Sequence, residues 1–206
     1  MLKILLSGFE PFGESAINPS QMLVDSLVTS TLPNVDCHAV ILPVDRDRGP
    51  AALLQAVDVY HPDVVLSFGL AMGRAKISLE RVALNLMDFR IPDNAGAQAQ
   101  DEPVIPGGPA AYFSSLPLRN LYKALVEKDI PVELSLSAGS YLCNQVYYAL
   151  MHAIAAQQKP IRAGFIHLPA LPEQAAAARQ ALPSMSFGTM HRAAETIMNV
   201  LMAEQA

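Results

Sequence analysis

Residues 132–157 read VELSLSAGSYLCNQVYYALMHAIAAQ. The stretch begins as an apolar, strand-like run, turns through the small residues SAGS and continues as a helix with one apolar face. Units of strand, turn and helix like this one recur along the 206-residue chain. Strands that alternate with helices of this length predict an α/β fold with a mainly parallel central sheet.

The same alternation assigns the other elements. A helix that begins near Asn18 has an N-cap residue there and Pro19 at its first helical position. Residues 90–116 are rich in Pro, Gly, Asn and Asp and have no sustained period, which predicts a long loop over the site or between subunits. We expect one domain over residues 1–206. The remaining strands are predicted at 3–8, 36–44, 63–69, 76–86 and 162–169, and the helices at 18–32, 48–61, 118–130, 172–182 and 189–205.

Composition narrows the class of protein. Hydrophobic residues make up 51% of the chain, so a large core is expected. Charged residues make up only 16%, against about 25% in typical domains, which predicts an apolar surface buried in a homo-oligomer. The net charge is −5 and no cluster of Lys and Arg occurs, which argues against binding to nucleic acid.

We expect neither a membrane span nor a signal peptide. Its apolar runs are far shorter than the roughly 20 residues of a membrane span. The segment MLKILLSGFEPFG at 1–13 is interpreted as a first strand, because its apolar run is too short for a signal peptide. Cys37 and Cys143 have no reason to pair, so we expect a reduced, cytoplasmic protein. No His or Cys spacing typical of a metal site occurs.

Unusual segments follow several of the predicted strands. In parallel sheets, sites form beyond the carboxyl ends of the strands. We therefore expect these segments to share one cleft. They are GFEPFG at 8–13, GLAMGR at 69–74, SAGSYLC at 137–143 and HLP at 167–169.

Cys143 is the first candidate for chemistry. It lies at the start of a predicted helix, where free N–H groups and the helix dipole favour a reactive thiolate. Its helical neighbours are apolar, so the side chain points toward the protein, and a buried core thiol is the alternative. Cys37 lies within a predicted strand and is interpreted as core. The apolar positions on the Cys143 face are Val146, Tyr147, Leu150, Met151 and Ile154.

An imidazole and a carboxylate would complete a hydrolytic site with this thiol. His167 ends an apolar strand, where a lone histidine is more often a surface residue or a structurally satisfied one than a base. Glu80 lies in an extended apolar run, and Asp88 and Asp93 are rival acids that the pattern does not separate from it.

Phe9 and Phe12 are aromatic residues within a loop-like segment. Flat apolar rings suit a small ring-shaped ligand, although packing beneath the loop explains them as well. The segment GFEPFGE matches neither of the glycine-rich phosphate-binding motifs GxGxxG and GxxxxGK[ST]. A phosphate site is therefore not expected.

Five segments resemble the pyroglutamyl-peptidase I (pyrrolidone-carboxylate peptidase) family of cysteine peptidases. They lie in family order between residues 7 and 174: GFEPFG with NPS, ERVALNL with RIPDN, GGPAAYFSSLP, SAGSYLCN, and GFIHLPALPEQ. The resemblance implies a three-layer α/β/α sandwich around a mixed sheet. It also implies a cytoplasmic enzyme, usually a homotetramer in bacteria, that removes N-terminal pyroglutamate from peptides without metal or cofactor.

The resemblance also assigns roles. It implies that Cys143 is the nucleophile, that His167 is the general base and then the acid, and that Glu80 is the third catalytic member. Arg90, in RIPDN, matches a residue placed near the oxyanion.

Substrate contacts follow from the same motifs. Phe9 and Phe12 match the aromatics that flank the pyrrolidone ring. Tyr141, within SAGSYLCN, belongs with them in the predicted substrate-binding set.

The chain departs from the family pattern at three positions. Leu70 stands where bacterial members often have a glutamine, so a polar amide near the pocket is replaced. Glu14 stands where members usually have a glycine, and Gln145 where a histidine is common. Losing one hydrogen bond to the substrate costs about 1–3 kcal/mol, roughly ten- to a hundredfold in affinity.

Two other functions are compatible with parts of the pattern. A non-catalytic protein that binds lactam or peptide ends on the same scaffold is supported only by the altered GLAMGR segment. A transferase like the nucleoside phosphorylases would share the fold but would need a phosphate site.

Overall fold

The structure is a computed structural model that describes residues 1–13, 15–29 and 34–204. Its centre is a six-stranded sheet with strand order β2-β1-β3-β8-β4-β7. β4 runs antiparallel to β8 and parallel to β7, and the other neighbours pair in parallel. The predicted mixed, mainly parallel sheet is confirmed. The strands are β1 (Leu2–Phe9), β2 (Val35–Leu42), β3 (Val64–Leu70), β4 (Ile77–Glu80), β7 (Val132–Ser135) and β8 (Arg162–Leu168).

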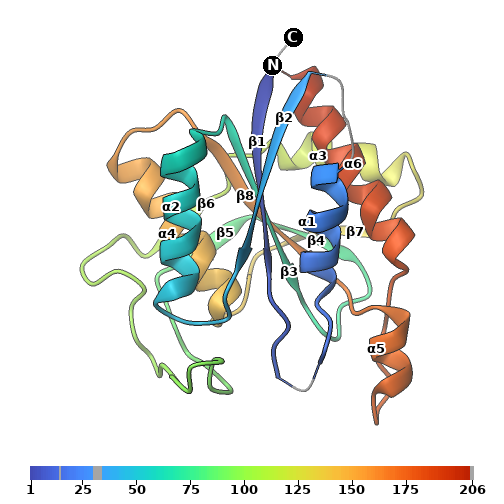
Figure 1. Cartoon of the computed structure of the whole chain (residues 1–206), viewed down its shortest axis with the longest axis horizontal. Coiled ribbons are helices and arrows are strands. Elements are labelled where there is room, and N and C mark those ends of the chain that lie inside the picture. Colours follow the sequence, from blue (N-terminus) through green and yellow to red (C-terminus); the bar gives the residue numbers. More distant parts are fainter. Residues whose placement is uncertain (14, 30–33, 205–206) are drawn as a thin grey trace.

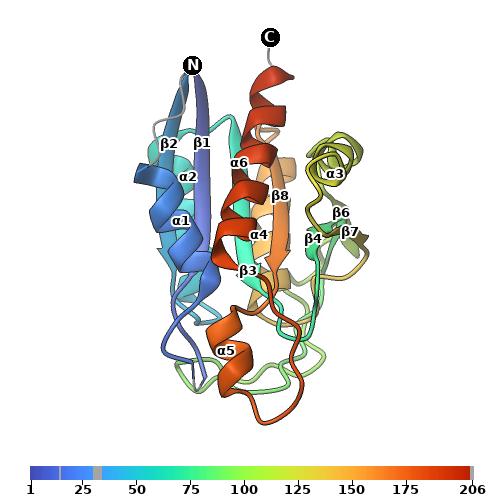
Figure 2. The same cartoon turned by 90° about the vertical axis from the view of Figure 1, so that its right-hand side faces the viewer.

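Helices cover both faces of this sheet, which confirms the three-layer α/β/α arrangement (Figure 1). One face carries α1 (Pro19–Thr29), α3 (Leu118–Val126) and α6 (Phe187–Ala203). The other carries α2 (Arg48–Tyr60) and α4 (Leu142–Ala156). The short α5 (Pro172–Ala177) lies beyond the end at which the β8 arrow points (Figure 2).

Alternation along the central strands builds a core on each face, because successive side chains of a strand point to opposite sides. In β1, Ile4 packs in the cluster beneath α1 and α6, whereas Leu5 packs in the cluster with α4. Leu66 and Val65 divide in the same way on β3. The buried strands therefore read as continuous apolar runs, as expected for strands covered on both faces.

The expected strand over 76–86 divides into two. After β4, the chain leaves the main sheet at Arg81 and forms β5 (Val82–Leu84), which pairs with β6 (Ala111–Phe113). The buried side chain of Asn144 explains the departure, because it hydrogen-bonds both the N–H and the C=O of Leu84 and holds β5 against α4. Apart from β6, the 90–116 loop is irregular.

Helix ends differ slightly from the expected bounds. α5 stops at Ala177 rather than at 182, and none of its residues is buried, so no packing extends it. α6 begins at Phe187, two residues early, because the Ser186 side chain caps the N–H of Thr189. Expected helical positions 30–32 and 205 lie outside the described residues. Within the described residues, none of the helices has the length and apolar character needed to cross a membrane.

Candidate active site

A cavity of about 280 Å³ opens at the carboxyl ends of β1, β3 and β8. All four strand-end segments singled out in the sequence contribute to it, as expected. Its lining is mainly apolar and consists of Phe9, Phe12, Asn18, Val44, Leu70, Ala71, Met72, Arg74, Ala138, Gly139, Tyr141, Leu142, Cys143 and His167.

Cys143 is the second residue of α4, and its thiol faces this cavity. The first N–H groups of a helix have no acceptor within the helix, so they are available to a ligand beside the sulfur. Gly69 makes room for the sulfur, because a Cβ at Gly69 would lie 2.8 Å from Sγ. Gly69 is also the strand partner of His167, so the thiol lies over the β3–β8 pair.

His167 and Glu80 form a buried pair. The Nδ1 of His167 lies 2.8 Å from Oε1 of Glu80, and the carboxylate is fully buried. In the β4–β8 register, His167 is opposite Ser78 and Glu80 is opposite Phe165, so both side chains stand on one face with the acid deeper. With Nδ1–H donated to Glu80, Nε2 is the ring nitrogen left for the cavity.

Arg74 is a component of the site for which the sequence analysis assigned no role. Its guanidinium donates to Oε1 of Glu80 at 2.6 Å and to the C=O of Ser137 at 2.8 Å, and the side chain is 28% exposed. Both described bonds to the carboxylate meet at Oε1, and Oε2 has no partner among the described residues. Arg74 is the only cation of GLAMGR, directly beyond β3, and that position at a strand end was the available signal.

The thiol and the imidazole are both neutral at rest. Burial, and then the charge of Glu80, raise the pKa of Cys143 to about 12. Burial lowers the pKa of His167 below its ordinary value, although Glu80 opposes this effect. Burial therefore opposes the thiolate that the helix start favours. The sulfur must lose its proton during the reaction.

Aromatic residues form one wall of the cavity. Phe12 lies 6.1 Å from Tyr141 between ring centroids, and Tyr141 makes an edge contact with Phe89 at 4.7 Å. The Tyr141 hydroxyl donates to the C=O of Pro92 at 3.1 Å, which fixes this ring in place. Phe9 and Leu70 also line the cavity.

The other candidate residues lie outside the cavity. Arg90 and Asp88 line a separate hollow beside it. Asp93 is buried, and its carboxylate accepts the N–H groups of Arg46, Ala95 and Ala97, so it holds a turn. Of the three rival acids, Glu80 is the one that contacts His167.

One departure from the family pattern, Gln145, lies away from the chemistry. Gln145 is 6% exposed, and its side-chain amide donates to the C=O of Arg46 at 2.6 Å on the far side of α4's first turn. Glu14 lies outside the described residues. Within the part of the chain that the structure describes, no group of three or more His, Cys, Asp or Glu side chains is arranged to hold a metal ion.

Comparisons with known proteins identify the family. A family model described as pyroglutamyl peptidase matches residues 2–204. The pyrrolidone-carboxylate peptidase of Vibrio vulnificus is 48% identical over 198 residues, covering 96% of this chain and 92% of the relative. A mutant pyrrolidone carboxyl peptidase from Pyrococcus furiosus superposes with a TM-score of 0.95 at 39% identity, covering 100% of both chains. Pyroglutamyl peptidase I from Bacillus amyloliquefaciens gives 0.91 at 36% identity, covering 95% of this chain and 92% of that one. The chain belongs to the pyroglutamyl peptidase family.

Proposed function

We propose that this chain hydrolyses the peptide bond after an N-terminal pyroglutamyl residue, with Cys143 as nucleophile, His167 as base and Glu80 as the supporting acid. Family membership makes it a pyroglutamyl peptidase, a hydrolase. The observation that carries the assignment of roles is the His167–Glu80 hydrogen bond beside a cavity that Cys143 also lines. The comparisons give no support to a non-catalytic binding protein.

Because thiol and imidazole start neutral, the first step couples proton transfer to attack. Nε2 of His167 takes the thiol proton as Sγ of Cys143 bonds to the substrate carbonyl carbon. The N–H groups at the start of α4 stabilise the oxyanion that forms. The C–N bond then breaks, and His167 gives its proton to the departing amine, which leaves a thioester.

Water completes the cycle. His167 takes a proton from a water molecule, whose oxygen attacks the thioester carbonyl. The C–S bond breaks, Cys143 recovers the proton from His167, and free pyroglutamate leaves. Glu80 stabilises the imidazolium in both halves of the reaction, and Arg74 donates a hydrogen bond to the same carboxylate oxygen that contacts His167.

The cavity suits the neutral lactam ring of pyroglutamate. Its lining is largely apolar, with Phe9, Phe12 and Tyr141 among its walls. Ordinary aminopeptidases must bind a charged amine, whereas a lactam nitrogen carries no charge. The cavity lining includes the charged side chain of Arg74, which is already hydrogen-bonded to Glu80.

We also propose that residues 1–206 form a single peptidase domain that acts on pyroglutamyl peptides in the cytoplasm as a homotetramer. The family match over 2–204 supports the single domain. The low content of charged residues and the exposed apolar side chains of Phe113 and Leu136 support assembly. Analytical ultracentrifugation at micromolar concentration tests the tetramer, and a monomer of about 22 kDa would contradict it.

The test of the function is release of the fluorophore from a pyroglutamyl coumarin amide in the presence of a reductant. The wild-type enzyme should cleave it, and Cys143→Ala should abolish turnover without changing the circular dichroism spectrum. Cys37→Ala is the matched control and should retain activity, because Cys37 packs on β2 with the core cluster beneath α1 and α6. Full activity of Cys143→Ala would refute the proposed nucleophile.

A further inference from the structure

A second hollow adjoins the active-site cavity. It is lined by Phe12, Asp88, Arg90, Ile91, Ser140 and Tyr141. Phe12 and Tyr141 line both hollows, so the two share a rim. Ser140 and Tyr141 directly precede the helix that carries Cys143. The shared rim places the second hollow next to the cavity that holds the sulfur, so a peptide chain leaving the cavity past Phe12 and Tyr141 enters it.

The polar side chains around the first cavity are already engaged. Arg74 is bonded to Glu80, and His167 is bonded to the same acid. Asn18 bonds the C=O of Glu10 and the N–H of Ser20. A peptide that leaves the cavity therefore finds few free polar groups on its lining.

Asp88 and Arg90 differ from the polar side chains of the first cavity in their contacts. Both are exposed in the second hollow, and within the described part of the chain neither side chain has a hydrogen-bond or ion-pair partner. The backbone beneath them is fixed, because the N–H of Asp88 donates to the C=O of Ser140 and the Ser140 hydroxyl donates to the C=O of Asp88. The side chains of Asp88 and Arg90 are thus available to a ligand, and hydrogen bonds to Ser140 hold the backbone at Asp88 in place.

We propose that this hollow binds the main chain of the leaving peptide, with Arg90 donating to a peptide C=O and Asp88 accepting from a peptide N–H. This inference rests on the proposed function and names its substrate class: peptides that extend at least one further peptide bond beyond the scissile one. A neutral pair of opposite charges matches the one donor and one acceptor of each peptide unit, so recognition does not depend on the side chains. Arg90 then acts on the leaving peptide rather than on the oxyanion.

The experiment compares two substrates of the purified enzyme: a pyroglutamyl coumarin amide, which has no peptide after the scissile bond, and a pyroglutamyl-Ala-Ala-Ala amide. The readout is the ratio of kcat/KM for the peptide to that for the coumarin amide. In Arg90→Gln and in Asp88→Asn this ratio should fall about three- to tenfold, mainly through KM. Peptides with Glu or Lys in place of the first Ala should show the same fall.

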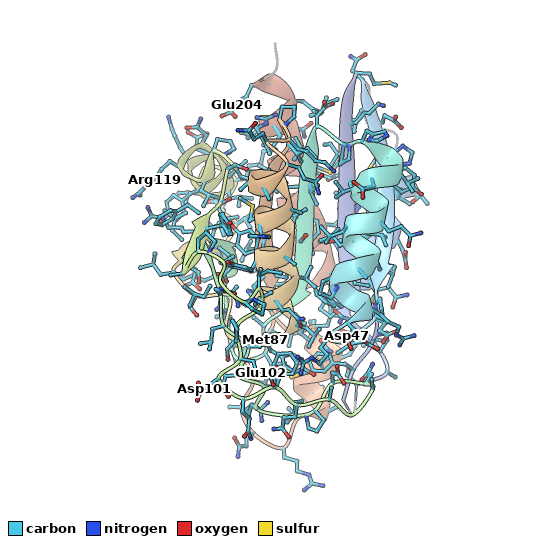
Figure 3. All side chains as sticks on the ribbon, turned by 90° about the vertical axis from the view of Figure 1, so that its left-hand side faces the viewer. Asp47, Met87, Asp101, Glu102, Arg119 and Glu204 are labelled. Atoms are coloured by element: carbon cyan, nitrogen blue, oxygen red, sulfur yellow. The ribbon has the colours of Figure 1, made fainter. Side chains whose placement is uncertain are left out.

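Matched controls are Arg119→Gln and Asp101→Asn, which make the same changes of charge at exposed positions. Figure 3 shows Arg119 on α3 and Asp101 projecting outward from the 90–116 loop. Both controls should keep the wild-type ratio.

Three results would overturn the inference. The first is an unchanged kcat/KM ratio in the variants, whether activity is retained or is lost equally on both substrates, because it would show that Arg90 does not bind the leaving peptide. A fall confined to peptides with Glu, or to those with Lys, would show recognition of side chains instead. Failure of the wild-type enzyme to cleave the coumarin amide would refute the proposed function and this inference with it.

Discussion

Replacing Arg74 by methionine tests the Arg74–Glu80–His167 chain of contacts. The change keeps an apolar stem but removes the guanidinium that lies 2.6 Å from Oε1 of Glu80. Breaking a fully buried ion pair costs about 3–5 kcal/mol. Arg74 is 28% exposed, so solvent screening reduces this to about 2–3 kcal/mol. For a chain of this length, that predicts a fall in Tm of roughly 5–10 °C, measured by scanning calorimetry at pH 7.

Activity provides the sharper measurement. The charge of Arg74 helps to lower the pKa of His167, so its removal raises that pKa. Because the reaction needs neutral His167, the acid limb of kcat/KM should move to higher pH in Arg74→Met. Arg74→Lys keeps the charge and should restore most of the wild-type limb. If the acid limb and the Tm of Arg74→Met were both unchanged, the argument that Arg74 positions Glu80 and lowers the pKa of His167 would be refuted.

Three further predictions concern the cavity. Alanine at Gly69 would place its Cβ 2.8 Å from Sγ of Cys143 and 2.8 Å from the Phe165 ring. Gly69→Ala should therefore lower the free energy of unfolding, measured in urea, by about 1–3 kcal/mol and should lose most of kcat. A wild-type kcat would contradict this packing. Leu70→Gln restores an amide and should raise kcat/KM on a pyroglutamyl amide about tenfold or more, whereas Leu70→Met should not; a fall with glutamine would show that the pocket recognises the ring by other means. Burial raises the pKa of both thiols, to about 11 for Cys37 and about 12 for Cys143, so thiolate content alone gives Cys143 no advantage. If His167 serves as base, iodoacetamide should nevertheless label Cys143 first, as read by peptide mass spectrometry, and His167→Ala should remove that preference; equal labelling in the wild-type enzyme would count against base assistance.

The layered fold was predictable because its signals are local. The central strands β1 and β3 are apolar runs, and the cap residue Asn18 marks where a helix begins. The direction of β4 was not predictable from composition or period, because its pairing with β8 and β7 depends on partners far away in the chain. The break at Arg81 depends likewise on Asn144, more than sixty residues later, which no local pattern reveals.

In the active site, too, features with local signals were predictable and features that depend on distant partners were not. Position at strand ends correctly grouped Phe12, Tyr141, Cys143 and His167 around one cavity. The pKa of Cys143 could not be predicted from the sequence, because it depends on the burial of the thiol in the assembled fold. Arg74 was missed for a related reason: its partner lies on the next strand, and their contact exists only once β4 has folded back.

The reversed strand β4 has a consequence for protein engineering. Six residues, 71–76, carry the chain from β3 into β4 and so set which β4 side chains face the imidazole. Because side chains alternate along a strand, an insertion or deletion there that shifted the register of β4 by one residue would turn the acid to the opposite side of the sheet. This connection should tolerate substitutions of residue type far better than any change in its length.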